Sequence, residues 1–356
     1  MKKFNLRLLA GLLILAPLSA CESAPPAPTG TAPQESAATA TSSRLDTVKS
    51  RGKLICGVEG TIPGFSFVDA GGNYSGLDVD VCKAVAAAVL GDATKVEYRN
   101  LDSTERFTAL RGGEVDMLSR NTTWTLSRDA AGGNAMEFVP TTFYDAQGMM
   151  VRTASGITKL EDLEGKRICV ETGTTTELNL TSRMTELGVK YTDVKFQDGS
   201  EAVQAYLQES CDAYTSDKSQ LFARRTQFPT PEEHTLLDVS MSKEPLGPVT
   251  INNDSQWFDA VKWVTFGLIQ AEEFGITQAN LGEIASTTQN KDIKNFLGLE
   301  GDLGTQLGLE KDYMQKVIGA VGNYGEIYDR NIGDGIPRGL NKLWNDGGLM
   351  YSPPAR

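Results

Sequence analysis

The feature that most constrains the fold is an alternation of strand-like and helix-like segments that runs once and then starts again. In the first run, strands at residues 53–58 and 95–99 flank a helix at 78–90, and the helix of "STERFTALRGG" leads to the strand "VDMLS". After "FVPTTFYDAQGMMVR" the order repeats, from the strand of "GKRICVETG" to the helix of "KSQLFARRTQ". Strands that alternate with helices form largely parallel sheets that helices cover. The sequence therefore predicts an α/β fold with two lobes.

The two runs also set the predicted domain boundaries. The chain leaves the second run through "EPLGPVTI" and enters a long amphipathic helix, so we expect lobe 1 to comprise residues 45–148 and 243–275, and lobe 2 residues 149–242. Residues 276–356 contain short helical segments separated by glycine turns, and we expect them to form a helical extension packed on lobe 1. The cleft between the lobes is the expected place for a small ligand.

The N-terminus has the pattern of an export signal. Residues 1–20 combine basic residues with an apolar run that is too short to span a bilayer, and "LSAC" ends on Cys21. This order resembles the lipobox of bacterial lipoproteins, so we expect Cys21 to be lipidated; an ordinary signal peptide with an incidental cysteine is the alternative. Residues 21–44 are rich in Pro, Ala, Thr and Ser and should form a disordered linker. The predicted location is the periplasm or cell envelope, with the lipid as the only membrane contact.

The composition argues against several classes of function. The formal net charge of the 356 residues is -12, which leaves no basic face to bind nucleic acid. The single histidine, His234, lies in "TPEEH", which we expect to be an exposed loop. A catalytic triad or a histidine-based metal site is therefore not expected, and neither is a cofactor or a metal ion.

Four cysteines remain in the predicted folded part, and export permits them to form disulfides. Cys56 and Cys169 each end a strand-like segment, whereas Cys82 lies in the first helix and Cys211 directly follows a helix of the second run. Four cysteines allow three pairings. We predict Cys56–Cys82 and Cys169–Cys211, because each pair then joins a strand to a nearby helix in one half of the chain. Two pairs of buried free thiols are the alternative.

Two segments place hydroxyls and backbone amides at the carboxyl end of a strand, where a helix follows: "VDMLSRNTTWTLSR" and "ETGTTTELNL". Free N–H groups and the dipole of a helix N-terminus favour an anion there. Arg128 adds a guanidinium that can hold a carboxylate with two hydrogen bonds. Asp217, at the end of "CDAYTSD", can accept hydrogen bonds from an ammonium group. A grip on a carboxylate and an acidic group on the other lobe suit a zwitterion, so the predicted ligand is an α-amino acid.

Each of these residues also has a structural alternative. Thr174–Thr176 could cap a helix, with Glu177 as the acid of a capping box, and both interpretations can hold because caps and anion sites use the same amides. Arg128 could lie on the surface. Phe65 and Trp124, which we consider candidate cleft residues, could instead be core aromatics.

At these motifs the chain resembles the periplasmic solute-binding proteins of polar amino acid ABC transporters, the bacterial extracellular solute-binding proteins of family 3. It is most similar to the general L-amino acid-binding branch, with kinship to the glutamate/aspartate binders. The matching motifs are "IPGF", "GLDVDVCKAVAAAVLGD", "RFTALRGGEVDMLSRNTTWTLSRD", "GTTTELNL", "CDAYTSDKSQL", "KEPLGPV" and "GLNKLWNDGGLMYSPP". The likeness covers nearly the whole mature chain. It implies a two-lobed clamp of the periplasmic-binding-protein type II, with a hinge and a helical C-terminal extension.

The resemblance also implies which residues hold the ligand. In the family, the position matching Arg128 clamps the α-carboxylate and the one matching Asp217 takes the α-ammonium group. Those matching Asn121 and Thr123 bond the ligand by main chain and hydroxyl. The one matching Thr175 bonds the carboxylate from lobe 2, with its neighbours Thr174 and Thr176.

The resemblance implies a polar or acidic ligand. Arg106 matches the arginine that reaches the side-chain carboxylate in the glutamate/aspartate binders, and Ser103 stands where many relatives have an aromatic residue. Arg120 matches no ligand position, and we interpret it as a surface or supporting charge.

The predicted function is therefore that of the substrate-binding lipoprotein of an ABC importer, which captures free L-amino acids and delivers them to a membrane permease. The expected hinge lies in two crossing segments, near Tyr144–Val151 and Ser240–Val249. One alternative is an envelope lipoprotein that senses amino acids. Another is a prephenate- or arogenate-type dehydratase on the same scaffold, with Glu177 as general acid. Because Glu177 is well explained as a residue of a helix first turn, we predict that the protein is not an enzyme.

Overall fold

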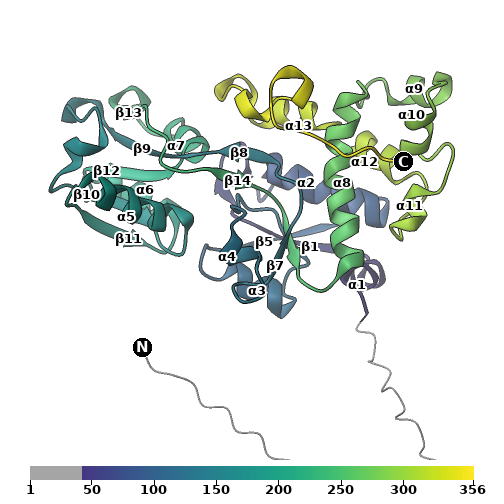
Figure 1. The fold of residues 1–356 in the computed structure, drawn as a ribbon, viewed down its shortest axis with the longest axis horizontal. Coiled ribbons are helices and arrows are strands. Elements are labelled where there is room, and N and C mark those ends of the chain that lie inside the picture. The colour runs from purple at the N-terminus through teal and green to yellow at the C-terminus, as the bar shows by residue number, and fades with distance from the viewer. Residues whose placement is uncertain (1–41) are drawn as a thin grey trace, which may run out of the picture. The chain divides into compact units, whose positions relative to one another are not determined.

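The computed structural model describes residues 42–356, apart from the side chain of Asp334 (Figure 1). The predicted signal peptide, the predicted lipidation site at Cys21 and the predicted linker up to residue 41 lie outside the described residues. No helix within the described part is long and apolar enough to cross a membrane.

The described chain enters the fold on lobe 1. Ser43 and Arg44, which the sequence analysis assigns to the end of the linker, are ordered and contact Asp254. The Ser43 hydroxyl donates to Asp254 Oδ1 (2.8 Å), and the Arg44 backbone N–H donates to Oδ2 (2.6 Å). Asp254 is also the N-cap of the long helix α8 (Ser255–Glu273), so one carboxylate joins the starts of α1 (Arg44–Arg51) and α8.

Lobe 1 is built on a five-stranded sheet with the strand order β5-β1-β6-β15-β7. β1 is parallel to β5 and β6, whereas β15 is antiparallel to β6 and β7. The strands are β1 (Leu54–Val58), β5 (Val96–Asn100), β6 (Met117–Leu118), β7 (Met136–Phe138) and β15 (Val249–Ile251). A small antiparallel sheet precedes the first long helix and comprises β2 (Thr61–Ile62), β3 (Ser66–Val68) and β4 (Tyr74–Ser75).

Lobe 2 has a second five-stranded sheet with the strand order β11-β10-β12-β9-β13. β10 is parallel to β11 and β12, whereas β9 is antiparallel to β12 and β13. The strands are β9 (Gln147–Arg152), β10 (Arg167–Glu171), β11 (Thr192–Phe196), β12 (Ala213–Asp217) and β13 (His234–Leu236). The helices are α5 (Thr175–Leu187), α6 (Gly199–Leu207) and α7 (Lys218–Arg225).

The chain crosses between the lobes twice, through the two strands of a separate small sheet. β8 (Phe143–Asp145) leads into β9 of lobe 2, and β14 (Glu244–Leu246) leads back to β15 of lobe 1. The two crossing strands pair with each other in antiparallel register, with Tyr144 opposite Pro245. Figure 1 shows this pair as the bridge between the two sheets.

The central helix of lobe 1 is α2 (Leu77–Leu90), and its composition explains its position. Its sequence LDVDVCKAVAAAVL is apolar on nearly all sides, and all but two of its residues are buried. The helix ends at Gly91, which has a φ of 70°. A helix that is apolar all round has to be covered on every side. The other lobe 1 helices, besides α1 and α8, are α3 (Arg106–Gly112) and α4 (Leu126–Asp129).

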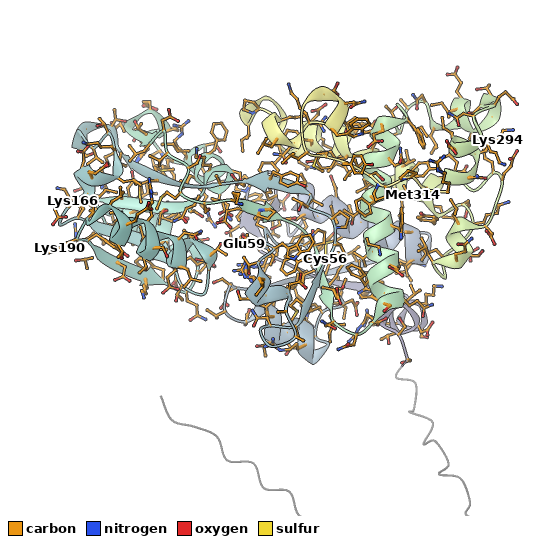
Figure 2. All side chains as sticks on the ribbon, viewed as in Figure 1. Cys56, Glu59, Lys166, Lys190, Lys294 and Met314 are labelled. Atoms are coloured by element: carbon orange, nitrogen blue, oxygen red, sulfur yellow. A yellow bond between two sulfur atoms is a disulfide. The ribbon has the colours of Figure 1, made fainter. Side chains whose placement is uncertain are left out.

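The helical C-terminal part supplies much of this cover. It contains α9 (Leu281–Thr287), α10 (Lys291–Phe296), α11 (Leu303–Gln306), α12 (Tyr313–Val321) and α13 (Tyr324–Asn331). α12 and α13 pack against α2 and α8, and their apolar side chains join the largest hydrophobic cluster of the molecule. A Cβ atom on Gly267 of α8 would lie 2.5 Å from the sulfur of Met314, so this glycine allows α12 to approach α8 closely (Figure 2).

Two disulfides connect the predicted cysteine pairs. Cys56–Cys82 joins β1 to α2 in lobe 1, and Cys169–Cys211 joins β10 to the segment after α6 in lobe 2. Each disulfide therefore constrains one lobe and neither of them links the two, as the strand-to-helix argument predicted.

The expectation that His234 lies in an exposed loop is wrong. His234 is 7% exposed and begins β13, with its Nδ1 2.9 Å from the Tyr206 hydroxyl and its ring packed edge-on against Phe228. The acidic residues before it form a short 3-10 turn that delivers the histidine into the edge strand of the lobe 2 sheet.

Candidate functional site

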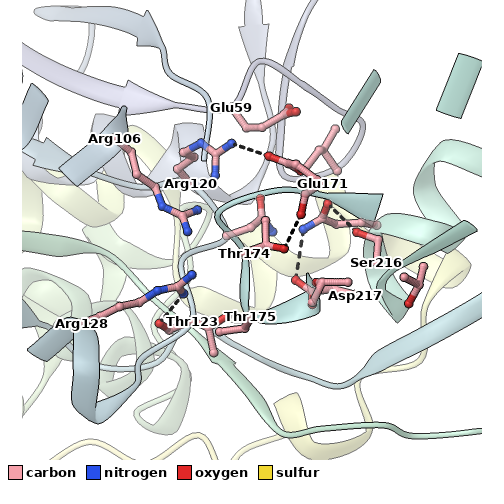
Figure 3. Close-up of a pocket in the computed structure, with 15 residues that line it drawn as sticks. Glu59, Arg106, Arg120, Thr123, Arg128, Glu171, Thr174, Thr175, Ser216 and Asp217 are labelled. Carbon is pink, nitrogen blue, oxygen red and sulfur yellow. Dashed lines mark hydrogen bonds and ion pairs between the residues drawn. The ribbon is translucent and has the colours of Figure 1, made fainter. Parts of the chain in front are cut away.

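A cavity of about 450 Å³, its mouth included, lies where the two lobes meet (Figure 3). All eight residues that the resemblance assigns to the cleft line it: Arg106, Asn121, Thr123, Arg128, Thr174, Thr175, Thr176 and Asp217. They come from α3, the β6–α4 segment, the N-terminus of α5 and the end of β12. The fold therefore brings together side chains that are up to 111 positions apart in the sequence, since Arg106 and Asp217 line the same cavity.

The first wall of the cavity is the segment between β6 and α4. Asn121 has a φ of 44°, an uncommon value for a residue with a side chain. Its backbone N–H donates to Asp78 Oδ2 (3.2 Å), while the Ser119 hydroxyl donates to Oδ1 (3.2 Å). Burial raises the pKa of Asp78 to about 7. Both polar atoms of the Asn121 side chain are buried without a partner among the described residues, so this side chain can bond to a ligand.

Two arginines present buried guanidinium groups to the same cavity. Arg128 is 7% exposed and donates to the Thr123 carbonyl oxygen (2.9 Å), and Arg106 is 3% exposed. Their guanidinium carbons lie 5.6 and 4.9 Å from the centre of the Phe107 ring. The ion pairs of the cavity wall are Arg120–Glu171 and Arg224–Glu59, and neither involves these two arginines. Two buried cations without an acidic partner in the described chain attract an anion.

Burial also lowers the pKa of both arginines, the direction expected for cations with little counter-charge. It lowers the pKa of Arg128 to about 10, against the opposing effect of Glu244 and Asp217. The pKa of Arg106 falls well below its ordinary value, because of burial first and of repulsion by Arg128 and Arg120 second. A carboxylate between the two arginines would reverse both effects.

The opposite wall is the N-terminus of α5. Thr174 is the N-cap, because its hydroxyl oxygen accepts from the Glu177 backbone N–H (3.1 Å). Glu177 does not complete a capping box; its Oε2 accepts instead from the Gly173 N–H (2.9 Å) and its Oε1 pairs with Lys195 (2.8 Å). The Thr175 hydroxyl donates to Glu244 Oε2 (3.0 Å). Thr174 thus caps the helix and lines the cavity, as the two interpretations together require.

Asp217 supplies a buried acid at the end of β12. It is 4% exposed; Oδ2 accepts from Gln220 Nε2 (3.1 Å), and Oδ1 is buried without a partner among the described residues. Burial raises the pKa of Asp217 well above its ordinary value, and repulsion by Asp145 and Glu244 adds to this. A cationic hydrogen-bond donor in the cavity would satisfy Oδ1 and favour the carboxylate.

The wall also contains residues that sequence reasoning missed. Glu59 directly follows β1 and pairs with Arg224 of lobe 2 (3.1 Å), and Arg120 of lobe 1 pairs with Glu171 at the end of β10 (3.6 Å). Arg120 is 5% exposed and lines the cavity, so of its two interpretations, a surface or a supporting charge, the surface one is wrong. Glu59 and Glu171 stand at the carboxyl ends of parallel strands, the same positional signal that selected the threonines.

Two candidate cleft residues lie away from the cavity. Phe65 is 1% exposed and packs edge-on against Phe143, with ring centres 5.0 Å apart. Trp124 is 44% exposed; it stacks on Phe138 and donates from Nε1 to Asp129 (2.7 Å). Neither ring lines the cavity, so both are excluded from the candidate site.

Comparisons with known proteins agree with this architecture. Residues 54–274 match the family described as bacterial extracellular solute-binding proteins, family 3. The chain is 50% identical over 326 residues to the general L-amino acid-binding periplasmic protein of Rhizobium johnstonii, covering 90% of this chain and 95% of that one. It is 49% identical over 324 residues to a glutamate/glutamine/aspartate/asparagine-binding protein of Rhodobacter capsulatus, with the same coverage. A periplasmic binding protein structure from Brucella ovis with glutathione bound has 46% identity and a TM-score of 0.85, covering 89% of this chain and all of that one.

Proposed function

The chain belongs to the bacterial extracellular solute-binding proteins of family 3, and we propose that it captures a free L-amino acid between its lobes and delivers it to the permease of an ABC importer. The observation that carries this proposal is the charge pattern of the cavity. Arg128 and Arg106 are buried cations without an acidic partner in the described residues, and Asp217 has a buried oxygen without a donor. A zwitterion supplies both missing partners.

The geometry supports one orientation of the ligand. Its α-carboxylate binds Arg128 and the Thr123 hydroxyl, and the Thr175 hydroxyl, 3.4 Å from that of Thr123 across the two lobes, turns from Glu244 to the carboxylate. Its α-ammonium group donates to Asp217. Each charge-assisted hydrogen bond of this kind is worth about 1.5–3 kcal/mol.

The side chain of the ligand then points toward Arg106 and Asn121. Both carry buried polar atoms without a partner among the described residues, Arg106 Nε and the two amide atoms of Asn121. We therefore propose a ligand with a carboxylate or amide side chain. The name of the Rhodobacter capsulatus relative, with its two acidic and two amide ligands, supports the same class.

Binding requires the lobes to open and close, and we propose that lobe 1 (45–148 and 243–275) and lobe 2 (149–242) move about β8 and β14. Support comes from the polar character of the contacts between the lobes around the cavity, since hydrogen bonds and ion pairs at a surface can exchange with water when the lobes separate. These contacts include the Glu59–Arg224 and Arg120–Glu171 ion pairs and the bond from the Ser103 hydroxyl to the Thr172 carbonyl oxygen (2.6 Å).

Isothermal titration calorimetry with the common L-amino acids tests this proposal. We expect binding of glutamate, aspartate and their amides by the wild-type protein, and a loss of at least tenfold in affinity for Arg128→Ala and Asp217→Ala. Arg183→Ala is the matched control, because Arg183 is a partly exposed residue of α5 outside the cavity whose ion-pair partner among the described residues is Glu186. Undetectable binding at millimolar ligand, or full affinity in both cavity variants, would rule the proposal out.

A second candidate ligand is glutathione, which the Brucella ovis structure contains. Glutathione begins with a γ-linked glutamate that has a free α-amino and α-carboxyl group, so the same four residues, Arg128, Thr123, Thr175 and Asp217, would hold it. Titration with reduced glutathione beside glutamate separates the two, since a tighter complex with glutathione would make the amino acid the weaker ligand.

Catalysis and anchoring are further parts of the proposal. Glu177, the candidate general acid, does not line the cavity and is held by Gly173 and Lys195, which supports a protein that binds without converting its ligand. Incubation with arogenate or prephenate, followed by absorbance of the aromatic product, tests this.

We propose export to the periplasm with a lipid on Cys21; mass spectrometry of the mature N-terminus would detect the acyl chains.

A further inference from the structure

Residues 276–356 lie beyond the part of the chain that matches the family and contribute nothing to the cavity. Their helices cover α2 and α8, which explains why this part of the chain packs on lobe 1. It does not explain the contacts that the segment from α13 onward makes beyond lobe 1. From α13 onward, this segment still adds buried side chains to the lobe 1 core, and it also contacts the crossing strand β8 and helix α7 of lobe 2.

The contact with β8 consists of side-chain hydrogen bonds to its backbone. Asn341 is 4% exposed; its side-chain oxygen accepts from the Tyr144 backbone N–H (2.6 Å) and its side-chain nitrogen donates to the Tyr144 carbonyl oxygen (3.2 Å). This is the pair of bonds that a neighbouring antiparallel strand would make with one residue. Just before β8, the buried Tyr324 hydroxyl donates to the Thr142 carbonyl oxygen (2.8 Å).

Asn341 is in turn held to lobe 1 through Arg338. Arg338 donates to the Asn341 carbonyl oxygen (2.9 Å) and pairs with Glu272 near the end of α8 through both guanidinium nitrogens. Its guanidinium carbon lies 5.3 Å from the ring centres of Tyr324 and Tyr328. The lobe 1 end of β8 is thus fixed up to Tyr144, which leaves the bending to the residues that follow.

The contact with lobe 2 is apolar and lies in the turn after α13. Ile332 and Ile336 pack against the large hydrophobic cluster of lobe 1, and Ala223 of α7 is the lobe 2 residue that joins this cluster. A Cβ atom on Gly335 would lie 3.1 Å from a ring carbon of Phe222, the residue before Ala223. Residues 332–336, which we call the receiving turn, therefore contact a helix whose remaining neighbours belong mainly to lobe 2.

We infer that the C-terminal part of the chain is a third element of the closing mechanism: it fixes the lobe 1 end of β8, and its receiving turn accepts α7 of lobe 2 when the lobes close. The inference rests on the proposed opening and closing of the lobes. A contact made only in the closed state shifts the population toward that state and raises the affinity for any ligand that the closed state holds.

A substitution in the receiving turn separates this role from a structural one. Gly335→Leu places a bulky side chain against Phe222 only when α7 is docked, and Phe222→Ala removes the same contact from the other side. Gly282→Leu is the matched control, since Gly282 lies in α9 of the same C-terminal part and a Cβ atom there would meet nothing within 4 Å. We expect the wild-type protein and the variants Gly335→Leu, Phe222→Ala and Gly282→Leu to have similar unfolding temperatures without ligand.

Closure can be measured without any ligand. The Thr123 and Thr175 hydroxyls lie 3.4 Å apart across the lobes, so the double variant Thr123→Cys, Thr175→Cys can form a disulfide when the lobes close. We expect the rate of this cross-link under mild oxidant, followed as the linked peptide by mass spectrometry, to fall about tenfold with Gly335→Leu or Phe222→Ala and to stay unchanged with Gly282→Leu. The affinity of the proteins with native Thr123 and Thr175 for L-glutamate should fall in parallel.

Equal cross-linking rates in all backgrounds would overturn the inference. If Gly335→Leu also lowers the unfolding temperature, its slower cross-linking reflects lost stability as well as lost closure. The cross-linking rate of Phe222→Ala then decides whether the contact favours closure. A slowed cross-link in a protein that binds no amino acid would leave the closing role standing while refuting the proposed ligand, so the two failures are distinguishable.

Discussion

Arg106 is the cavity residue whose role depends most on the ligand. Its guanidinium is buried beside Arg128 and Arg120, and it forms no ion pair among the described residues. We expect Arg106→Gln to weaken binding of glutamate by about 10- to 100-fold and that of glutamine by much less, because only the carboxylate needs a full positive charge. Calorimetry with both ligands measures the ratio. Arg111→Gln, on the exposed face of the same helix, is the control, and an equal loss for both ligands would contradict the assignment.

Asp217 should couple ligand binding to proton release. Burial and the repulsion by Asp145 and Glu244 raise the pKa of Asp217, so the empty site takes up a proton there at a higher pH than a free aspartate does. The ammonium group of a ligand lowers that pKa again, and the proton leaves on binding. Apparent affinity therefore rises with pH until the free site is itself deprotonated.

Calorimetry in buffers with different ionisation enthalpies counts the released protons. Asp217→Asn should abolish the release that the wild-type protein shows. Proton uptake on binding, or a release that persists in Asp217→Asn, would show that another group titrates.

At the scale of single elements, α5 combines a structural and a binding role at one terminus. Its N-cap hydroxyl belongs to Thr174, which also lines the cavity. Thr174→Ala should lower the free energy of unfolding by about 1 kcal/mol. Chemical denaturation measures this effect, and Thr181→Ala, which removes an exposed hydroxyl in the middle of the same helix, is the control. No difference between the two variants would contradict the cap.

The elements that carry a strong local signal were predictable from the sequence. α2 is a continuous apolar run that ends at a glycine, and the strands before Ser119 and Thr172 are apolar segments that stop at polar clusters. β8 and β14 gave weaker signals, because a short strand that pairs with only one other strand needs neither alternation nor a continuous apolar run. Their pairing depends on where the two lobes place the ends of the chain.

The same limit applied to the site. The threonines and Asp217 are predictable because each stands at or just after the end of a strand, and Arg128 because it lies in the short helix that follows such a segment, where a motif can be read locally. The Glu59–Arg224 pair joins residues 165 positions apart, and it forms only through the orientation of one lobe against the other. Asn341 and Tyr144 are 197 positions apart, and their contact depends on the course of the entire C-terminal part.

On the scale of the whole molecule, the two disulfides stabilise the lobes separately. Their loops span 26 and 42 residues, one in each lobe. We expect the double variant Cys169→Ala, Cys211→Ala to lose about 2–4 kcal/mol of stability in lobe 2 while lobe 1 is affected little. Hydrogen exchange followed by mass spectrometry resolves the two lobes, and the variant Cys56→Ala, Cys82→Ala serves as the reciprocal control. Equal losses in both lobes would show that they unfold as one unit.

The bond between Ser43 and Asp254 places the start of the described chain on lobe 1. Because the described chain starts at the N-cap of α8, any tether attached to the N-terminus holds lobe 1 and leaves lobe 2 free to swing. In the proposed closing motion, lobe 1 with the C-terminal helices packed on it is the part joined to such a tether, and lobe 2 is the part that moves relative to it. Each capture event would then bring the lobe that carries Asp217 toward the tethered lobe that carries Arg128.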